Sequence, residues 1–233
     1  MAERRSAAWS TADAIKQHII DAGLVSGDLM PTEGDLCETL GVSRSSVREA
    51  MRTLASLDIV EVRHGHGTYV GLMSLDPLVN GMVFRLSATG LKSLRDVVQT
   101  RIALDLAMAE ELVKAHSGTH DTVLHELVDQ MRANTRAGES FMEQDRDFHA
   151  RLSSGIDNQI IGELAGAFWE IHTRSLPMLG VSTPADIMDT VDAHAAILEA
   201  VEAGDLRAYH AAVAAHYAPL QRAIERAEAT DAP

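Results

Sequence analysis

The sequence predicts a mostly α-helical protein, with an N-terminal winged helix-turn-helix followed by a C-terminal all-α helical bundle. Two short helical segments flank a tight turn at Gly41-Val42-Ser43, which is the pattern of a helix-turn-helix. A hairpin with the Gly-rich tip Arg63-His64-Gly65-His66-Gly67 comes next and would form the wing. From Leu91 onward the apolar residues recur at helical spacing, with no convincing strand and no internal repeat.

Capping signals mark where the N-terminal helices begin. Ser10-Thr11-Ala12-Asp13 fits a capping box, from which an apolar stripe runs to Ala22. Thr32-Glu33-Gly34-Asp35 is expected to cap a second helix. Ser43 is suited to cap the third, because a serine side chain accepts a hydrogen bond from an amide of the first turn. The sequence therefore predicts three helices before the hairpin.

The third helix carries the predicted DNA-contacting face. Val47, Met51 and Leu54 recur at helical spacing and would face the core, which turns the arginines outward. Arg44 and Arg48 lie four residues apart on one face, and guanidinium groups suit both guanine edges and phosphate oxygens. A plain solvated face is the alternative, but the turn, the cap and the wing together favour DNA. The predicted DNA-binding residues are Thr32, Ser43, Arg44, Ser45, Ser46, Arg48, Arg52, His66 and Gly67.

Breaks in the helical pattern divide the C-terminal part into six or seven helices. They fall near residues 117–118, 137–138, 157–158, 176–184 and 204–205, where Gly, Pro, Asp or Asn interrupts the apolar spacing. These patterns assign residues 1–75 to the winged helix-turn-helix, 76–90 to a linker, 91–228 to the bundle and 229–233 to a tail.

Composition limits the class of function. The 233-residue chain has a net charge of −14, but residues 1–75 hold only 10 acidic side chains against 7 basic ones, so most of the acidity lies elsewhere. DNA binding stays possible, because charges beyond about 8–10 Å are screened, although non-specific binding should be weak. The lack of any apolar run of about 18 residues excludes a membrane span. One cysteine and no export signal predict a cytoplasmic location.

Four residues of the bundle are expected to form a metal site. Asp145 and His149 are four residues apart and share a helical face. His194 and His216 lie at similar separations on either side of the turn at 204–205, so an antiparallel helix pair would bring their imidazoles level. One carboxylate and three imidazoles suit a divalent cation, with zinc first and nickel or manganese as alternatives.

The other histidines of the bundle carry weaker signals. His116, His120 and His125 cluster near a loop and are expected to be solvated. His172 lies on the same helix as Trp169 and either lines a cavity or belongs to the core.

Residues 31–70 resemble the winged-helix reader of the GntR family of bacterial transcription regulators, with GVSRSSVREA and GHGTYV as the strongest local matches. The helical remainder is similar to the FCD effector-binding domain of the family's FadR branch, where DRDFH and the paired histidines match. The resemblance covers nearly the whole chain. Gly34 departs from the pattern, because family members usually carry an arginine there that contacts DNA.

This resemblance implies a ligand-responsive transcriptional regulator that is not an enzyme, expected to be a repressor that binds a palindromic double-stranded operator as a homodimer. The spacing of the four predicted ligands matches the metal site of FCD domains. Arg101 matches the family arginine that faces the effector cavity and can grip a carboxylate, and Arg174 is a second, weaker candidate. The implied effector is a small carboxylate or hydroxy acid.

Three alternatives stay open at this stage. Arg101 could be a surface residue paired with Asp105 four residues later. Three histidines and a carboxylate could activate water in a metal-dependent hydrolase, although no general base is evident beside them. The metal could also be purely structural, with an empty cavity.

Overall fold

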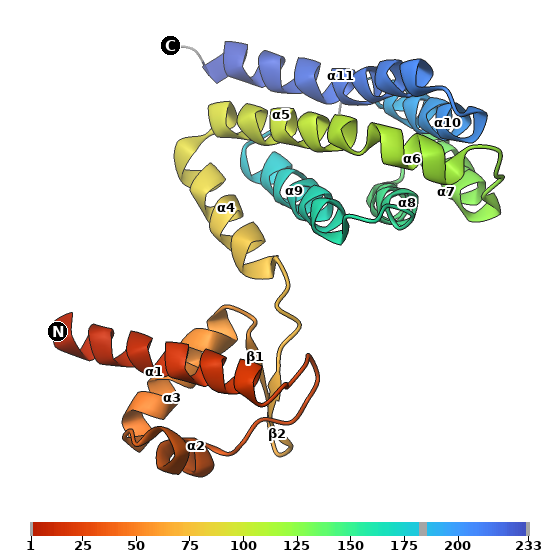
Figure 1. The fold of residues 1–233 in the computed structure, drawn as a ribbon. Helices are drawn as coiled ribbons and strands as arrows, with labels where there is room; N and C mark the ends of the chain where they lie inside the picture. Colours follow the sequence, from red (N-terminus) through yellow and green to blue (C-terminus); the bar gives the residue numbers. More distant parts are fainter. Residues whose placement is uncertain (1, 182–185, 232–233) are drawn as a thin grey trace. The chain divides into compact units, whose positions relative to one another are not determined.

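The computed structural model describes residues 2–181 and 186–231, and the chain divides into two compact units, Met1–Pro77 and Leu78–Pro233. Figure 1 shows helices throughout, with one antiparallel pair of strands in the first unit. Eleven helices, α1 to α11, lie in the described part of the chain. This composition confirms the predicted mostly α-helical fold class.

The first unit is a three-helix arrangement followed by a hairpin. The first helix begins at Ala2, earlier than the predicted start at Ser10, so the capping box expected there does not open it. Both α1 and α2 pack against α3, and α3 also packs against the first strand. The elements are α1 (Ala2–Asp21), α2 (Glu33–Leu40), α3 (Arg44–Ser56), β1 (Val60–Arg63) and β2 (Gly67–Val70).

The turn between α2 and α3 has the geometry of a helix-turn-helix. Gly41 closes α2 in the left-handed region, with φ 66°, which glycine adopts without steric cost. Thr32 and Asp35 form the predicted capping box at the start of α2. Ser43 caps α3, as predicted, by accepting a hydrogen bond from the Ser46 amide.

The wing is an antiparallel hairpin that is extended by one more pairing. Val60 pairs with Val70 and Arg63 with Gly67, and Leu29 makes an isolated bridge to Tyr69 on the outer side of β2. Gly71 follows β2 where the chain runs close to the start of β1. A Cβ atom there would lie 2.2 Å from the carbonyl oxygen of Asp58, so no larger residue fits without a shift of the backbone.

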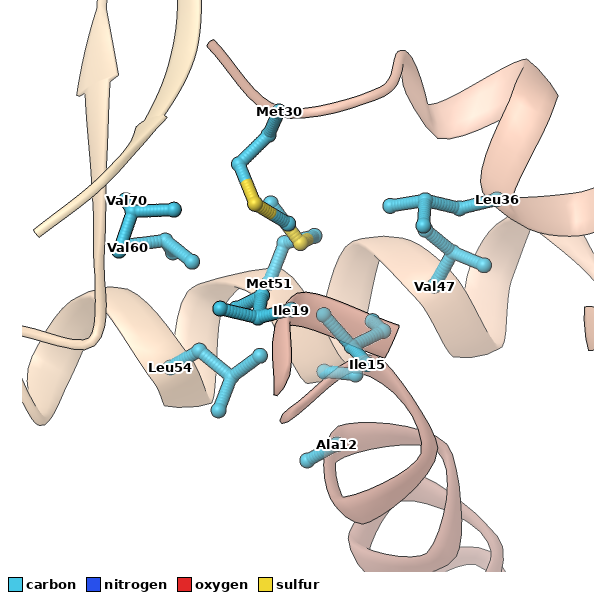
Figure 2. Packing of buried hydrophobic residues seen from close by; sticks show 11 residues of the cluster. Ala12, Ile15, Ile19, Met30, Leu36, Val47, Met51, Leu54, Val60 and Val70 are labelled. Carbon is cyan, nitrogen blue, oxygen red and sulfur yellow. The ribbon is translucent and has the colours of Figure 1, made fainter. Parts of the chain in front are cut away.

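Apolar side chains from all three helices and the hairpin meet in one core (Figure 2). Ile15 of α1 and both Val47 and Leu54 of α3 are fully buried in this core. The hairpin contributes Val60 and Val70, which fix the wing to the end of α3 that is far from the turn. This core holds the outer face of α3 in place. The buried members are Ala12, Ile15, Ile19, Met30, Leu36, Val47, Ala50, Met51, Leu54, Val60 and Val70.

Eight helices follow the hairpin. Residues 76–90, expected as a linker, are largely helical, because α4 covers them up to Thr89; proline at the second residue of that helix is compatible with a helix start. A break at Met108, which the sequence pattern did not reveal, separates α5 from α6. The elements are α4 (Asp76–Thr89), α5 (Leu91–Ala107), α6 (Ala109–His116), α7 (Thr122–Ala137), α8 (Met142–Ser153), α9 (Gln159–Met178), α10 (Ile187–Ala203) and α11 (Leu206–Asp231).

The long helices of the second unit form an antiparallel bundle. Helices α10 and α11 pack along each other across the turn at Gly204, and α11 also runs along α5. Helix α9 packs on α5, and α8 lies between α7 and α9 (Figure 1). The predicted breaks near 117, 137, 157 and 204 all separate helices, whereas part of the break predicted at 176–184 lies outside the described residues. Residues 229–231 of the predicted tail belong to α11, and 232–233 are outside the described part.

Among the described residues, no helix combines the length and the apolar character that crossing a bilayer requires.

Candidate functional site

The outer face of α3 carries the arginines of the predicted DNA reader. Arg44, Arg48 and Arg52 are all exposed, while Val47 on the opposite side is fully buried. Arg48 Nη2 lies 3.3 Å from Glu33 Oε2 on α2, so one of the three cations already has an acidic partner. An exposed pair of this kind is worth only about 0–1 kcal/mol, and a phosphate oxygen can take the place of the carboxylate.

The hydroxyl groups of the predicted DNA-binding set take part in helix capping. Thr32 Oγ1 donates to Asp35 Oδ2 and accepts from the Asp35 amide. Ser43 Oγ accepts from the Ser46 amide at 3.2 Å and lies 2.8 Å from Ser45 Oγ. These side chains therefore fix the starts of α2 and α3, and with them the direction of the arginines.

The wing tip presents the remaining predicted DNA contacts. His66 is exposed between two glycines, and Gly67 has φ 113°. The Tyr69 hydroxyl donates to the carbonyl of His66, and the guanidinium of Arg63 stacks on the Tyr69 ring, 4.2 Å from its centroid. Tyr69 thus supports both the backbone of the tip and a cation beside it. Arg63 was not among the predicted contacts.

The structure brings the four predicted metal ligands together in the second unit. Asp145 and His149 come from α8, His194 from α10 and His216 from α11, and one ligand atom of each lies within 4.8 Å of all the others. The imidazole centroids of His194 and His216 are 4.4 Å apart, because the antiparallel pair α10 and α11 places these residues level. His194 is fully buried and His216 is 5 % exposed.

Hydrogen bonds orient the ligand atoms of this cluster. The Nδ1 of His194 donates to the carbonyl oxygen of Thr190 at 2.8 Å, which turns Nε2 toward Asp145 Oδ1, 2.7 Å away. The other carboxylate oxygen of Asp145 accepts a hydrogen bond from the indole nitrogen of Trp169 on α9. His149 Nε2 lies 3.7 Å from Asp145 Oδ1. Outer partners of this kind commonly fix the ligands of metal centres.

Burial and mutual proximity set the charges of the cluster. Burial lowers the pKa of His149 to about 3 and holds the pKa of His216 well below its ordinary value, so both imidazoles are neutral at pH 7. Burial by itself raises the pKa of Asp145, but the hydrogen bond with His194 and the surrounding imidazoles outweigh it, so the pKa lies well below its ordinary value. The cluster therefore offers one carboxylate and the neutral imidazoles of His149 and His216.

The donor set fits a divalent cation. His149 Nε2 and His216 Nδ1 are buried without a hydrogen-bond partner, which is unfavourable for polar atoms unless something else satisfies them. Three imidazoles and one carboxylate are ligands of zinc, and nickel or manganese also accept this combination. Three features of these side chains support the fit. Two imidazole nitrogens have no hydrogen-bond partner, the Asp145 carboxylate is held by hydrogen bonds, and the pKa values of His149 and His216 are low.

Two cavities lie beside this cluster. One has a volume of about 440 Å³ and is lined by His149, the other has about 620 Å³ and is lined by Asp145 and His216. Arg101 and Trp169 line both of them. Each cavity therefore has both a predicted metal ligand and the cationic side chain of Arg101 in its wall.

Arg101 is a buried cation that forms no salt bridge with any carboxylate of the described residues. Burial raises the pKa of the nearby Asp105, and the charge of Arg101 opposes that rise. Arg101 is 5 % exposed; its Nη1 donates to His172 Nδ1 at 2.9 Å, and its guanidinium carbon lies 5.0 Å from the centroid of the Tyr217 ring. Among the described residues no carboxylate pairs with it, so the alternative of a surface ion pair with Asp105 is wrong. Asp105 instead accepts a hydrogen bond from the Tyr217 hydroxyl at 2.6 Å.

Arg174, the second predicted effector contact, lies elsewhere. Its side chain is 45 % exposed and pairs with Glu170 one turn earlier on α9, at 3.0 Å. It lines neither cavity, because it lies two residues after His172 and therefore on another face of the helix. The structure places Arg101 beside the predicted metal ligands and leaves Arg174 at the surface.

Comparison with known proteins assigns the chain to a family. A model described as "Bacterial regulatory proteins, gntR family" matches residues 8–70, and a model of the FCD domain matches residues 96–219. The chain belongs to the GntR family and has an FCD domain. Members of this family are DNA-binding transcriptional regulators, so the metal-dependent hydrolase alternative is set aside.

Three regulators illustrate the relationship of this GntR-family protein to others. The galactonate operon transcriptional repressor of Escherichia coli (strain K12) is 24% identical over 199 residues, which are 81% of this chain and 84% of that protein. The HTH-type transcriptional regulator LutR of Bacillus subtilis (strain 168) is 26% identical over 202 residues, or 83% and 90% of the two chains. The Streptococcus agalactiae GntR structure has a TM-score of 0.64 and 29% identity, and the match covers 92% of this chain and 99% of that one.

Several residues around the predicted metal ligands and Arg101 could not be identified from the sequence. Trp169 holds Asp145 from another helix, and Tyr217 lies under Arg101; neither has a local signal that distinguishes it from a core aromatic residue. His172 is a core residue that also lines the larger cavity, so both open interpretations of it describe the structure. His116 and His125 were expected to be solvated, but each is partly buried and hydrogen-bonded.

Proposed function

We propose that this protein is a ligand-responsive repressor that senses a small carboxylate or hydroxy acid at a metal centre. A divalent cation, zinc first and nickel or manganese as alternatives, would be held by Asp145, His149, His194 and His216. The observation that carries the proposal is the convergence of these four groups within 4.8 Å, beside a buried arginine and two cavities. When bound, the cation would attract an anionic oxygen of the effector as a Lewis acid.

Arg101 supplies the second point of recognition. A guanidinium that is 5 % exposed is costly to bury when no carboxylate of the described residues forms a salt bridge with it, and Asp105 acts on it only through space. An incoming carboxylate would supply the missing direct pair. His172 cannot neutralise it, because an imidazole carries either no charge or a positive one. Burial and the neighbouring Arg101 hold the pKa of this imidazole well below its ordinary value, so it accepts the hydrogen bond as a neutral group. The effector would therefore place one anionic group at Arg101 and another oxygen at the metal ligands.

The sizes of the cavities support a small effector. Volumes of about 440 and 620 Å³ lie within the range of pockets for small molecules. Polar groups at the wall of the larger cavity, among them Thr173 and Thr190, could bind hydroxyl groups. The galactonate operon repressor bears the name of a hydroxy acid, which agrees with this chemistry.

Control of DNA binding would follow from a shift between two arrangements of the protein. An effector can favour one arrangement only by its difference in affinity for the two, typically about 1–3 kcal/mol of coupling. Two copies of α3 on a palindromic operator would respond to such a shift through their spacing, which is why we propose a homodimer.

Titration calorimetry tests the sensing site. The zinc-loaded protein would be titrated with galactonate, lactate, citrate and succinate, and each titration would be repeated after removal of the metal with a chelator. The proposal predicts that at least one acid binds the zinc-loaded protein and binds the chelated protein much more weakly. Binding that is equal in both states would overturn the metal-centred proposal, and binding of none in either state would indicate a purely structural metal.

A further inference from the structure

A second cluster of potential ligands lies away from the site described above, where the start of α7 approaches the end of α10. His120 precedes α7, His125 lies in its first turn, and Glu202 is near the last turn of α10. One ligand atom of each lies within 4.8 Å of the other two. His125 Nε2 is 3.0 Å from Glu202 Oε1, and His120 Nδ1 is 3.7 Å from the same oxygen.

The backbone fixes the carboxylate of this cluster. The amide of Asp121 donates to Glu202 Oε1 at 3.1 Å, and the amide of Gly118 donates to the carbonyl of Glu202 at 2.8 Å. The Glu202 side chain is therefore only 16% exposed, although it lies at the edge of the bundle. An anchored carboxylate loses little conformational entropy when it gains a further ligand.

The two imidazoles are close together and open to solvent. Their ring centroids are 4.3 Å apart, and the His120 side chain is 66% exposed while that of His125 is 37% exposed. Solvent access lets an ion enter without rearrangement of the bundle. It also leaves coordination positions for water, as metal sites with only three protein ligands require.

We propose that His120, His125 and Glu202 form a second divalent-cation site, independent of the centre around Asp145. Two imidazole nitrogens and one carboxylate oxygen suit zinc, and also copper(II) or nickel. The cation would take the place of the proton that His125 Nε2 shares with Glu202, and the imidazole would then carry its hydrogen on Nδ1.

The surrounding charge favours a cation at this place. Residues 76–233 hold 24 acidic and 13 basic side chains. Arg151, a basic group beside the cluster, is occupied by Asp121, with its Nε 2.8 Å from a carboxylate oxygen. No Lys or Arg of the described residues forms an ion pair with Glu202, so its charge is available to a metal.

Occupation of this site would have a structural consequence. Glu202 lies on α10, the helix that carries His194, whereas His120 and His125 lie beside and within α7. A cation would therefore fasten the segment between α6 and α7 to the end of α10. Zinc bound there should raise the temperature of thermal unfolding, even when the first centre is already filled.

Zinc titration of the chelator-treated full chain against a chromophoric competitor tests the proposal. The wild type should bind two zinc ions. In His120→Ala the ion at the centre around Asp145 should bind as in the wild type, while the affinity for the second ion should fall by at least about tenfold. His120 is exposed, so this change should leave the fold intact. His210→Ala is the matched control, because His210 is also exposed and lies outside both clusters.

The outcomes separate the two metal sites. Coincident curves for His120→Ala and the wild type would overturn the second site, and so would an equal weakening by His210→Ala, which would indicate adventitious binding to surface histidines. A wild type that binds one ion, lost in His120→Ala, would support this site and contradict the centre around Asp145. Glu202→Gln, which keeps the shape but removes the charge, should weaken the same ion as His120→Ala does.

Discussion

His194 Nε2 lies 2.7 Å from Asp145 Oδ1, while its Nδ1 is bonded to the carbonyl of Thr190. A carbonyl oxygen can only accept, so Nδ1 carries a hydrogen and the short Nε2 contact needs either a second proton or a cation. The hydrogen bond that orients His194 therefore leaves its Nε2 in a position where a bound cation would stabilise the contact with Asp145. His149 supports the same site by a different observation, because its Nε2 is buried without a hydrogen-bond partner.

Trp169 should act as a positioning residue for the metal. Its indole nitrogen donates to Asp145, so Trp169→Phe removes that hydrogen bond and keeps an aromatic ring in place. Loss of such an outer partner typically weakens metal binding by about 10–100-fold. Competition titration with zinc measures the change. Trp9→Phe, at the only other tryptophan of the chain, is the control and should bind zinc as the wild type does; equal affinity of all three proteins would remove Trp169 from the centre.

Arg101→Met should separate effector binding from metal binding. Loss of a charge-assisted hydrogen bond of about 1.5–3 kcal/mol should weaken carboxylate binding by about 10–150-fold. Zinc should bind at least as tightly as before, because Arg101 is a positive charge close enough to lower the pKa values of His149 and His216. Calorimetry with zinc and with a carboxylate measures both effects.

The control for Arg101→Met is Arg174→Met, since Arg174 is exposed and paired with Glu170. Arg174→Met should bind zinc and the carboxylate with the affinities of the wild type. If the two methionine variants bind a carboxylate equally well, Arg101 is not the effector contact.

Acid should destabilise the metal-free protein. His149 has a pKa of about 3 in the folded protein against an ordinary value of 6.5, so between these values the unfolded chain binds more protons. The free energy of unfolding should therefore fall as the pH drops below about 6.5, by up to about 1.4 kcal/mol per pH unit for each such imidazole. Chemical denaturation of the chelator-treated protein at several pH values gives the slope.

His149→Leu should reduce the slope of the free energy of unfolding against pH, because leucine cannot bind a proton and the contribution of one imidazole is lost. His216 contributes in the same direction, since burial keeps its pKa well below the ordinary value. Stability that stays constant from pH 7 to pH 5 would contradict the burial of neutral imidazoles.

Arg48→Ala should weaken binding to an operator duplex that the wild type selects from a random-sequence pool. The loss should be about 1–3 kcal/mol if the guanidinium reads a base. Glu33→Gln is the informative partner, because it removes the acidic group 3.3 Å from Arg48 and should keep or tighten binding. Band-shift titrations measure both changes, and the reading face would be misassigned if both Arg44→Ala and Arg48→Ala bound like the wild type.

The helix caps and turns that depend on residues close together in the sequence could be predicted from it. The Thr32 and Ser43 caps and the left-handed Gly41 depend on neighbouring residues, so their roles could be inferred from spacing. Asp145 and His149 share one face of α8 for the same reason. His194 and His216 required one further assumption, an antiparallel pair of helices across Gly204, which the structure contains.

Contacts between distant elements could not be predicted in this way. The hydrogen bond from Trp169 to Asp145 joins two helices, and no sequence pattern near either residue predicts it. Arg101 looked equally suited to a surface pair with Asp105, because four-residue spacing is satisfied whether a helix face is buried or exposed. The helix at Asp76–Thr89 was missed because helical spacing was recognised only from Leu91 onward, although proline at the second residue is favoured in the first turn of a helix.

The response of operator affinity to the effector tests whether the metal centre controls DNA binding. The zinc-loaded protein would be titrated onto its selected operator with and without a saturating carboxylate identified by calorimetry, and again after chelation. The account predicts a change in affinity of about 5–150-fold that chelation abolishes. An operator affinity that the carboxylate leaves unchanged, or changes equally with and without the metal, would contradict it.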